Sequence, residues 1–413
     1  MKKFILKITS LLFALTLSLS VTACKETTDN NEETNNNNHV HEYSTIYEYD
    51  SLSHWYEATC GCDINVKDKT NHEMLNGACK SCNYKLSNGL EFELNSNGST
   101  YCLIGMGSCR DTEVCIPSSY ADSSGNTFPV TDINATAFNK NTTVKTIIVP
   151  YGVTNISNGA FANCSNLRKV VLPKGIKKLG LSLFQRCYNL EEVNIPSTVE
   201  SIGHGSFHEC SQLKSIVIPD SVKTIVLASF NGCSNLETVV IGNGVESMGD
   251  RTFTQCKKLK KLVLGKNVKS IGVNSFTGCT SLKEVHIDSV GAWLNIEMGS
   301  LDENNVFQTT DANPLLKGAK LYLNGELLTR LEIPEGTLEI KASAFTNYKT
   351  FTYIKIPKSV KKIGMLAFTG CEKVEVIEYA GTVDEWLKIN KSTAWAGRTI
   401  AKKVTCTDGE VQI

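Results

Sequence analysis

The chain has 413 residues, with 42 basic and 42 acidic side chains, so its formal net charge at pH 7 is zero. A balanced charge produces no broad electrostatic field, which excludes general attraction to nucleic acid or to an anionic membrane surface. The length would suit two or three ordinary domains, but repeat arrays do not obey that limit.

The first 24 residues are typical of an export signal. Three lysines at positions 2, 3 and 7 precede a short apolar segment at 8–20, which is too short for a stable spanning helix. The following Val21-Thr22-Ala23-Cys24 resembles the lipobox of bacterial lipoproteins, which implies cleavage before Cys24 and lipidation of its thiol. An ordinary signal peptide with an incidental cysteine is the alternative. We expect an exported protein, lipid-anchored to the bacterial cell membrane and facing outside.

Residues 25–38 are rich in asparagine and contain no apolar side chain that could pack. Such a composition predicts a disordered tether between the membrane and the folded parts. Residues 39–88 differ, because they are aromatic, rich in histidine and contain four cysteines. We interpret residues 39–88 as a small separate module.

The cysteines of this module suggest a structural zinc site. Cys79 and Cys82 have the C-x-x-C spacing with which two thiolates chelate one tetrahedral metal ion. Cys60, Cys62 and His72 are the further candidate ligands. Disulfides are the competing interpretation, because export permits them. A module this small needs such a cross-link, and with every coordination position filled its role is structural.

Residues 89–137 precede the regular repeats. Residues 90–94 alternate apolar and polar side chains with a period of two, which predicts a half-buried strand. The open end of a repeat array needs an atypical cap, and we expect this segment to supply it.

Residues 138–287 repeat one pattern every 23 residues, with Cys three residues after Phe and Leu three residues after Cys. A fixed period in this range is the signature of a solenoid, whose units bury their apolar faces by stacking. The phenylalanines are Phe138, Phe161, Phe184, Phe207, Phe230, Phe253 and Phe276. The cysteines are Cys164, Cys187, Cys210, Cys233, Cys256 and Cys279.

Each unit predicts an α/β-type solenoid coil of one short parallel strand and one 3₁₀ or short helical turn. In the unit that begins at Leu190, Val193 and Ile195 alternate inward and Pro196 ends the strand. Phe207 and Cys210 then share one face of the expected helical turn. We interpret the cysteine ladder as small buried hydrophobic side chains, because Tyr348 replaces the thiol in a later unit.

The unit IPxxVxxIGxxAFxxCxxL, as in 195–213 and 218–236, resembles the BspA-type leucine-rich repeat of bacterial surface proteins. The resemblance covers about 115–406. It implies a right-handed superhelix with a strand-lined concave face, and attachment to host matrix proteins or to neighbouring cells. The module at 39–88 also resembles segments found upstream of such repeats. Their second cysteine position, here Cys62, is often His, which agrees with a ligand role.

The repeat register breaks after residue 287. We expect an irregular insertion at 288–327 with a short helix at 291–296 and a hairpin turn at Asn324-Gly325. Regular repeats resume at 328–373, and residues 374–413, with Trp386 and Trp395, form the predicted C-terminal cap.

The candidate partner-binding residues lie on the outward side of the repeat strands, where alternation places every second side chain. An exposed apolar column is a plausible docking surface, although β-branched residues also simply suit exposed parallel strands. The candidates are Ile148, Val171, Val217, Val240, Val263, His286 and Tyr353.

Catalytic motifs are missing from the sequence: it has no phosphate-binding loop, nucleophile elbow or paired-carboxylate motif. His204 and His208 have chelating spacing, but they straddle a corner, which favours a surface role. We expect a non-catalytic, surface-anchored binding or adhesion protein. A structural spacer without a ligand is the alternative, and a zinc enzyme acting through 39–88 is the remote one.

Overall fold

The computed structural model describes residues 48–49, 53–57, 66–71, 74–75, 78–79, 85–301, 307–308, 311–392 and 394–413. The chain divides into two compact units, Met1–Leu86 and Ser87–Ile413. Cys24 and the candidate zinc ligands Cys60, Cys62, His72 and Cys82 lie outside the described residues, as does the side chain of Cys79. The choice between zinc and disulfides therefore stays a prediction.

The first unit contains short antiparallel strands. The order β1-β2-β3 forms one sheet, and β4 pairs with β5. The strands are β1 (Glu48–Tyr49), β2 (Ser53–Glu57), β3 (Val66–Asn71), β4 (Met74–Leu75) and β5 (Ala78–Cys79).

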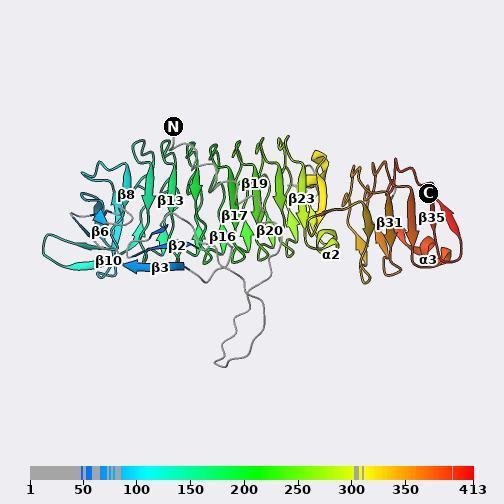
Figure 1. The fold of residues 1–413 in the computed structure, drawn as a ribbon, viewed down its shortest axis with the longest axis horizontal. Coiled ribbons are helices and arrows are strands. Elements are labelled where there is room, and N and C mark those ends of the chain that lie inside the picture. The colour runs from blue at the N-terminus through cyan, green and yellow to red at the C-terminus, as the bar shows by residue number, and fades with distance from the viewer. Residues whose placement is uncertain are drawn as a thin grey trace, which may run out of the picture. The chain divides into compact units, whose positions relative to one another are not determined.

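The second unit is a stack of coils in which each regular coil contributes to two parallel sheets (Figure 1). One face, which we call the long-strand face, carries strands of two to four residues; the other, the short-strand face, carries strands of two residues. The long-strand face of the first stack consists of β8 (Glu113–Cys115), β11 (Thr146–Ile148), β13 (Lys169–Val171), β15 (Glu192–Val193), β17 (Ser215–Ile218), β19 (Thr238–Ile241), β21 (Lys261–Val263), β23 (Glu284–Ile287) and β27 (Lys320–Leu323). The short-strand face consists of β12 (Asn155–Ile156), β14 (Lys178–Leu179), β16 (Ser201–Ile202), β18 (Thr224–Ile225), β20 (Ser247–Met248), β22 (Ser270–Ile271) and β24 (Glu297–Met298).

A small mixed sheet precedes the regular coils. The strand expected at 90–94 is β6 (Glu91–Leu94), which pairs antiparallel with β7 (Tyr101–Gly105). β10 (Thr127–Ile133) joins β7 to β12 in parallel and also pairs with β9 (Ser119–Ala121). This sheet ends at β12, and the next short strand, β14, begins a separate sheet.

The turn that carries each phenylalanine differs from the expected 3₁₀ or helical turn. In the described coils between residues 138 and 287 this segment contains no helix. Two left-handed residues flank each phenylalanine from Phe161 to Phe276 instead; around Phe184 they are Ser182 (φ 54°) and Arg186 (φ 59°). Such a backbone turns the N–H of Phe184 toward the next coil, where it donates to the Ser206 carbonyl at 2.7 Å. The fold is therefore a leucine-rich repeat solenoid with little helix.

Phenylalanine and cysteine ladders fill the interior. Rings of neighbouring coils stack on one another. The centroids of Phe207 and Phe230, for example, are 4.9 Å apart, and their rings form an interplanar angle of 4°. Each ladder thiol also donates to the carbonyl oxygen of the phenylalanine one coil earlier, at 3.0–3.2 Å. The cysteines are buried, as expected, but they act as hydrogen-bond donors as well as small apolar side chains.

The insertion joins two coil stacks. The helix expected at 291–296 is α2 (Val290–Leu294), and the expected hairpin joins β27 to β28 (Glu326–Leu327) through Asn324 (φ 49°) and Gly325 (φ 85°). The indole of Trp293 donates to the Ala344 carbonyl at 3.2 Å. The remaining elements of the insertion are β25 (Ser300–Leu301), β26 (Phe307–Gln308) and the 3₁₀ helix η1 (Pro314–Lys317).

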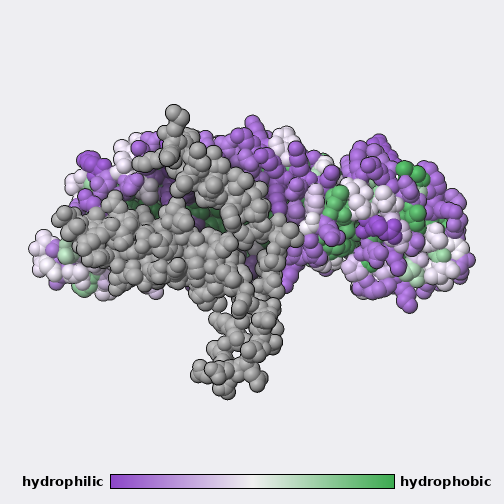
Figure 2. Space-filling model, in the orientation of Figure 1, coloured by the Kyte–Doolittle hydropathy of each residue, from purple (hydrophilic) through white to green (hydrophobic). Residues whose placement is uncertain are grey.

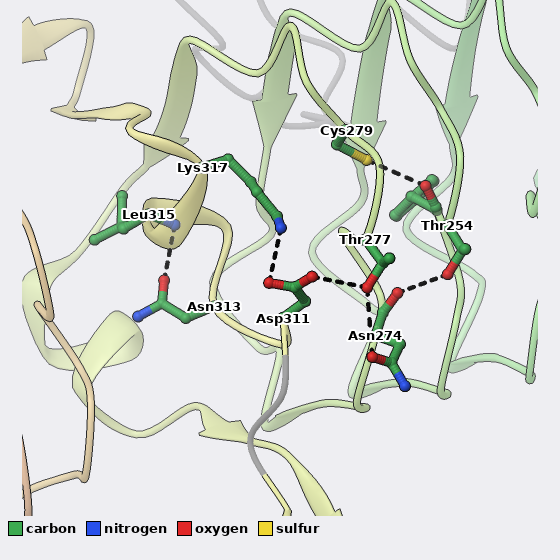
Figure 3. Close-up of polar contacts among 9 residues, drawn as sticks. Thr254, Asn274, Thr277, Cys279, Asp311, Asn313, Leu315 and Lys317 are labelled. Carbon is green, nitrogen blue, oxygen red and sulfur yellow. Dashed lines mark hydrogen bonds and ion pairs between the residues drawn. The ribbon is translucent and has the colours of Figure 1, made fainter.

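At this joint Asp311 makes the backbone contact that the next regular coil would otherwise make (Figure 3). Its carbonyl accepts from the Phe276 N–H, a position that Ser275 serves for Phe253 one coil earlier. Its carboxylate binds the Lys317 ammonium at 2.7 Å and accepts from the Thr277 hydroxyl at 2.9 Å. These contacts hold η1 against the last regular coil of the first stack.

Tyr348 occupies the cysteine position of the first coil after the joint. Its hydroxyl bonds the N–H and C=O of Leu321 and the C=O of Leu328. A thiol is too short to reach these groups, so the tyrosine satisfies backbone atoms that the missing coil would otherwise satisfy.

The second stack repeats the two-face design and contains the helix α3 (Val383–Lys388), whose Trp386 packs on Trp395. Among the described residues, no helix is long and apolar enough to cross a membrane. The strands of the second stack are β29 (Arg330–Glu332), β30 (Glu339–Ile340), β31 (Tyr353–Ile356), β32 (Lys362–Ile363), β33 (Val376–Tyr379), β34 (Asn390–Lys391), β35 (Lys403–Thr405) and β36 (Glu410–Gln412).

Candidate binding surface

The strand register aligns one apolar column on the outward side of the long-strand face. Val217, Val240 and Val263 are direct partners on β17, β19 and β21, and the same register continues to His286 and Tyr322. Val217 is 63% exposed, whereas Val240 and Val263 are half-buried between their neighbours. The 23-residue period therefore brings together side chains that are widely separated in the sequence.

Most of the visible repeat surface is hydrophilic, and its hydrophobic residues form small patches (Figure 2). A column of consecutive valines is unusual on such a surface, because outward positions of a solvated strand are generally polar.

Ile148 differs from the expectation. It belongs to the same column, but it is only 2% exposed. In register it lies between Cys115 of β8, which is also buried, and Val171 of β13, which is half-buried. Strand alternation predicts the face of the sheet to which a side chain points, but it does not predict whether neighbouring residues bury that side chain. The accessible part of the column therefore begins at Val171.

His286 and Tyr322 form an aromatic pair at the other end of the column. Their rings stack at 4.7 Å with an interplanar angle of 8°, and His286 Nε2 lies 3.0 Å from a Glu284 carboxylate oxygen. Burial lowers the pKa of His286 below its usual range, against the opposing effect of Glu284, so the ring is neutral at pH 7. Tyr322 was missed in the sequence, although Leu321-Tyr322-Leu323 alternates as a strand does.

Tyr353 lies on the outward side of β31 but is covered, with 9% of its surface exposed. The Arg330 guanidinium lies 3.9 Å above its ring, and its hydroxyl donates to a Glu378 carboxylate oxygen. Burial and Glu378 raise the pKa of Tyr353 to about 12. Tyr353 therefore anchors a charged cluster and does not present its ring to a partner.

Asn194 interrupts the column. Its amide oxygen accepts from the Leu172 N–H at 2.7 Å, and its amide nitrogen donates to the Leu172 carbonyl at 2.8 Å. The side chain thus takes the place of a neighbouring strand backbone. In the sequence, an asparagine at a position that is otherwise β-branched is the signal that could have indicated this break in the column.

Charged residues around the column neutralise one another between coils. Lys169 pairs with Glu192 at 3.4 Å, and Lys260 pairs with Glu237 at 2.8 Å, each across one repeat period. Exposed pairs like these contribute little stability. Their effect here is to keep the surroundings of the apolar column close to neutral.

The described residues contain no group of three or more His, Cys, Asp or Glu side chains arranged to hold a metal ion. His204 is exposed and His208 is half-buried, with its Nε2 3.7 Å from a Glu209 carboxylate oxygen. The expectation that this histidine pair has a surface role remains the simplest interpretation.

The stacked coils and the outward column define a solenoid repeat protein with an extended strand surface. The chain belongs to the BspA-type leucine-rich repeat family, whose model matches residues 124–225, 200–301 and 318–393, well over half of the chain. No curated protein matches the chain.

Several solved bacterial structures are similar to this chain. A leucine-rich repeat protein from Bacteroides ovatus is 23% identical, with 76% of this chain and 89% of that chain covered and a TM-score of 0.44. A leucine-rich cell surface protein from Faecalibacterium prausnitzii is 22% identical, with coverage of 75% and 99% and a TM-score of 0.37. The T. pallidum leucine-rich repeat protein is 25% identical, with coverage of 48% and 78% and a TM-score of 0.36. The family assignment rests on the family match and on the repeat itself.

Proposed function

We propose that this protein is displayed on the bacterial surface and binds a protein partner through its long-strand face. The observation that carries the proposal is the column of Val217, Val240 and Val263, which continues in register into the His286–Tyr322 pair. Contiguous apolar surface costs solvation free energy unless a partner covers it, at about 25 cal/mol per Å².

The neutral surroundings of the column suit a protein partner. Because Lys169 and Glu192, and likewise Lys260 and Glu237, neutralise each other, no strong field selects a polyanion. A partner that presents apolar or β-branched side chains fits this surface best. In the proposed setting it is a protein of the host matrix or of a neighbouring cell.

Display on the surface is proposed to depend on Cys24. Lipidation of its thiol would anchor the protein, and residues 25–38 would act as the tether. Mass spectrometry of the protein extracted from membranes should show a diacylated or triacylated Cys24 at the new N-terminus. A Cys24→Ser variant should be released from the membrane fraction, and retention of this variant there would contradict lipid anchoring.

Binding is tested with the purified chain and a solubilised extracellular-matrix preparation, and separately with intact neighbouring bacterial cells. We expect saturable binding to at least one of them. Replacing Val217, Val240 and Val263 by lysine should remove this binding without unfolding the repeats. A protein that binds neither preparation would be better described as a structural spacer.

A further inference from the structure

Three backbone hydrogen bonds join the turn around each phenylalanine to the turn of the next coil. They are formed from Phe161 to Phe253 and again in the second stack. Around Phe345, for example, the N–H groups of Ser343, Phe345 and Asn347 donate to carbonyl groups of the following coil at 2.7–2.9 Å. Each such turn therefore presents N–H groups to the coil that follows it and carbonyl groups to the coil that precedes it.

The turn at 394–398 is the last of this kind in the described part of the chain, at the C-terminal end of the second stack (Figure 1). Its Trp395 and Gly397 carbonyls accept from the N–H groups of Phe368 and Gly370 in the preceding coil, each at 2.7 Å. The turn is therefore joined to the stack in the same way as a regular coil.

The other side of this turn consists of donors that no following coil uses. Ala394 (φ 58°) and Arg398 (φ 65°) flank Ala396 just as left-handed residues flank the phenylalanines. By position, the N–H groups of these three residues are the forward donors. None of them donates to a group within the described residues. The end of the stack therefore presents a short row of N–H groups.

The carbonyl groups of the same turn are already hydrogen-bonded. Those of Trp395 and Gly397 bond the preceding coil, the Ala394 carbonyl accepts from the Thr369 hydroxyl, and the Ala396 carbonyl accepts from the Thr399 hydroxyl at 3.1 Å. The turn thus offers donors rather than acceptors. A peptide strand brings both kinds of group, whereas an oxyanion brings acceptors alone, so an oxyanion matches this turn better.

The same turn lines an open cavity of about 280 Å³. Residues 394–399 line it together with three residues of the following segments, among them Lys402. Trp395 is held at this place by edge contacts with Phe368 and Trp386, whose ring centroids lie 6.1 and 5.5 Å away. The volume is close to the lower limit of small-molecule sites, about 300 Å³. The donors therefore border a space that admits a small ligand.

Two cationic side chains, Arg398 and Lys402, line the cavity. Neither forms an ion pair with a described residue, whereas the adjacent Lys403 pairs with Glu410 at 2.6 Å. The Lys402 ammonium donates to the Thr399 carbonyl at a long 3.4 Å. The described residues that line the cavity include no acidic side chain. Two positive charges without a counter-charge therefore lie beside the row of N–H donors, and charge-assisted hydrogen bonds to an oxyanion require this combination.

We propose that the cavity at the end of the second stack binds one small oxyanion, a carboxylate or a phosphate group. Its oxygen atoms would accept from the N–H groups of the turn at 394–398 and from the side chains of Arg398 and Lys402. The site is separate from the column on the first stack, so the inference goes beyond the proposed function and does not depend on it.

The test uses the full-length protein and three probes. They are inorganic phosphate, galacturonate and galactose, which has the ring of galacturonate without its carboxylate. Isothermal titration calorimetry should show saturable binding of at least one of the two anions, with a dissociation constant below about 1 mM. Galactose should bind at least tenfold more weakly. The anion that binds more tightly identifies the kind of oxyanion that the site takes.

A double variant, Arg398→Gly with Lys402→Gln, removes the two cations. Glycine suits the left-handed backbone, as Gly370 (φ 78°) does at the same position of the preceding coil, so the variant should fold. It should bind the anion at least tenfold more weakly. Lys403→Gln is the matched control for loss of charge, because Lys403 is adjacent to Lys402 but does not line the cavity, and its affinity should not change.

Hydrogen exchange reports on the backbone part of the site. Binding of the anion should slow exchange of the Ala396 and Arg398 amides and leave exchange in β29 unchanged. Binding without slower exchange at 394–398 would place the anion elsewhere and overturn the proposal. It is also overturned if neither anion binds below about 1 mM, if galactose binds as tightly, or if the double variant keeps its affinity with a native circular dichroism spectrum.

Discussion

The thiol of Cys210 donates a hydrogen bond of 3.2 Å to the carbonyl oxygen of Phe184 in the preceding coil. The same bond recurs along the ladder and across the second stack, from Cys371 to Phe345 at 3.2 Å. These carbonyls lie in turns where left-handed residues direct the backbone between coils. The cysteine is therefore a buried cross-coil donor as well as a small apolar side chain.

This bond predicts different costs for two small substitutions at Cys233. Cys233→Ala removes one of the two donors to the Phe207 carbonyl, which keeps the Cys210 N–H at 3.1 Å, and it also leaves a small cavity, so we expect a loss of about 1–3 kcal/mol in the free energy of unfolding. Cys233→Ser keeps a donor and should lose less. Denaturant unfolding of both variants measures the difference. A serine variant less stable than the alanine variant would show that the hydrogen bond is not the main contribution.

Burial of the thiols also predicts a pH dependence. Burial raises the pKa of Cys233, Cys279 and Cys371 from an ordinary 9.0 to about 12. The folded state thus prefers the protonated thiol, so this contribution to stability is complete below pH 9 and is lost as the pH rises toward 12. Alkylation of these cysteines by iodoacetamide should be slow at pH 8 in the native protein and fast in denaturant. Fast alkylation of Cys233 in the native state would contradict the buried ladder.

The joint between the two stacks should depend on the hydroxyl of Tyr348. Tyr348→Phe keeps the ring but removes the hydrogen bonds to Leu321 and Leu328, which should cost about 1–3 kcal/mol. Hydrogen exchange should accelerate in β27 and at residue 328. Because each coil contacts mainly its neighbours, exchange in β13 should stay unchanged, and a uniform acceleration would argue against a local joint.

Close stacking of coils predicts a severe effect at Gly244. A Cβ built on Gly244 would lie 1.6 Å from the Asp220 carbonyl oxygen, so Gly244→Ala forces neighbouring coils apart. We expect a loss of more than about 2 kcal/mol in unfolding free energy. Gly397→Ala is the matched control, because its Cβ would meet no atom closer than 3.6 Å. Similar melting temperatures for the two variants would contradict the tight packing at Gly244.

The sequence predicts the coil well because the 23-residue period repeats a strong pattern. The alternation at 90–94 identifies β6, and Asn324-Gly325 identifies the hairpin turn, whereas the alternation at Val193 and Ile195 overstates β15, which ends at Val193. The two-residue strands of the short-strand face are too brief for alternation to reveal them.

Other features lack a local signal. Left-handed backbone at ordinary residues such as Arg186 and Leu366 (φ 59° each) is imposed by bonds between coils, so composition does not predict it and a helical turn was expected instead. On the candidate surface, alternation gives the direction of Ile148 and Tyr353 but not the groups that cover them. The role of Asn194 depends on a backbone group one coil away.

The most direct test of the account replaces Val217, Val240 and Val263 by lysine in the full-length protein and measures binding to the matrix preparation. The control replaces Thr224, Ser247 and Ser270 by lysine, which places the same charge on the short-strand face of the same coils. Both variants should show native circular dichroism. We predict at least a tenfold loss of affinity in the valine variant and little change in the control. Equal binding by both variants would contradict the assignment of the long-strand face as the binding surface.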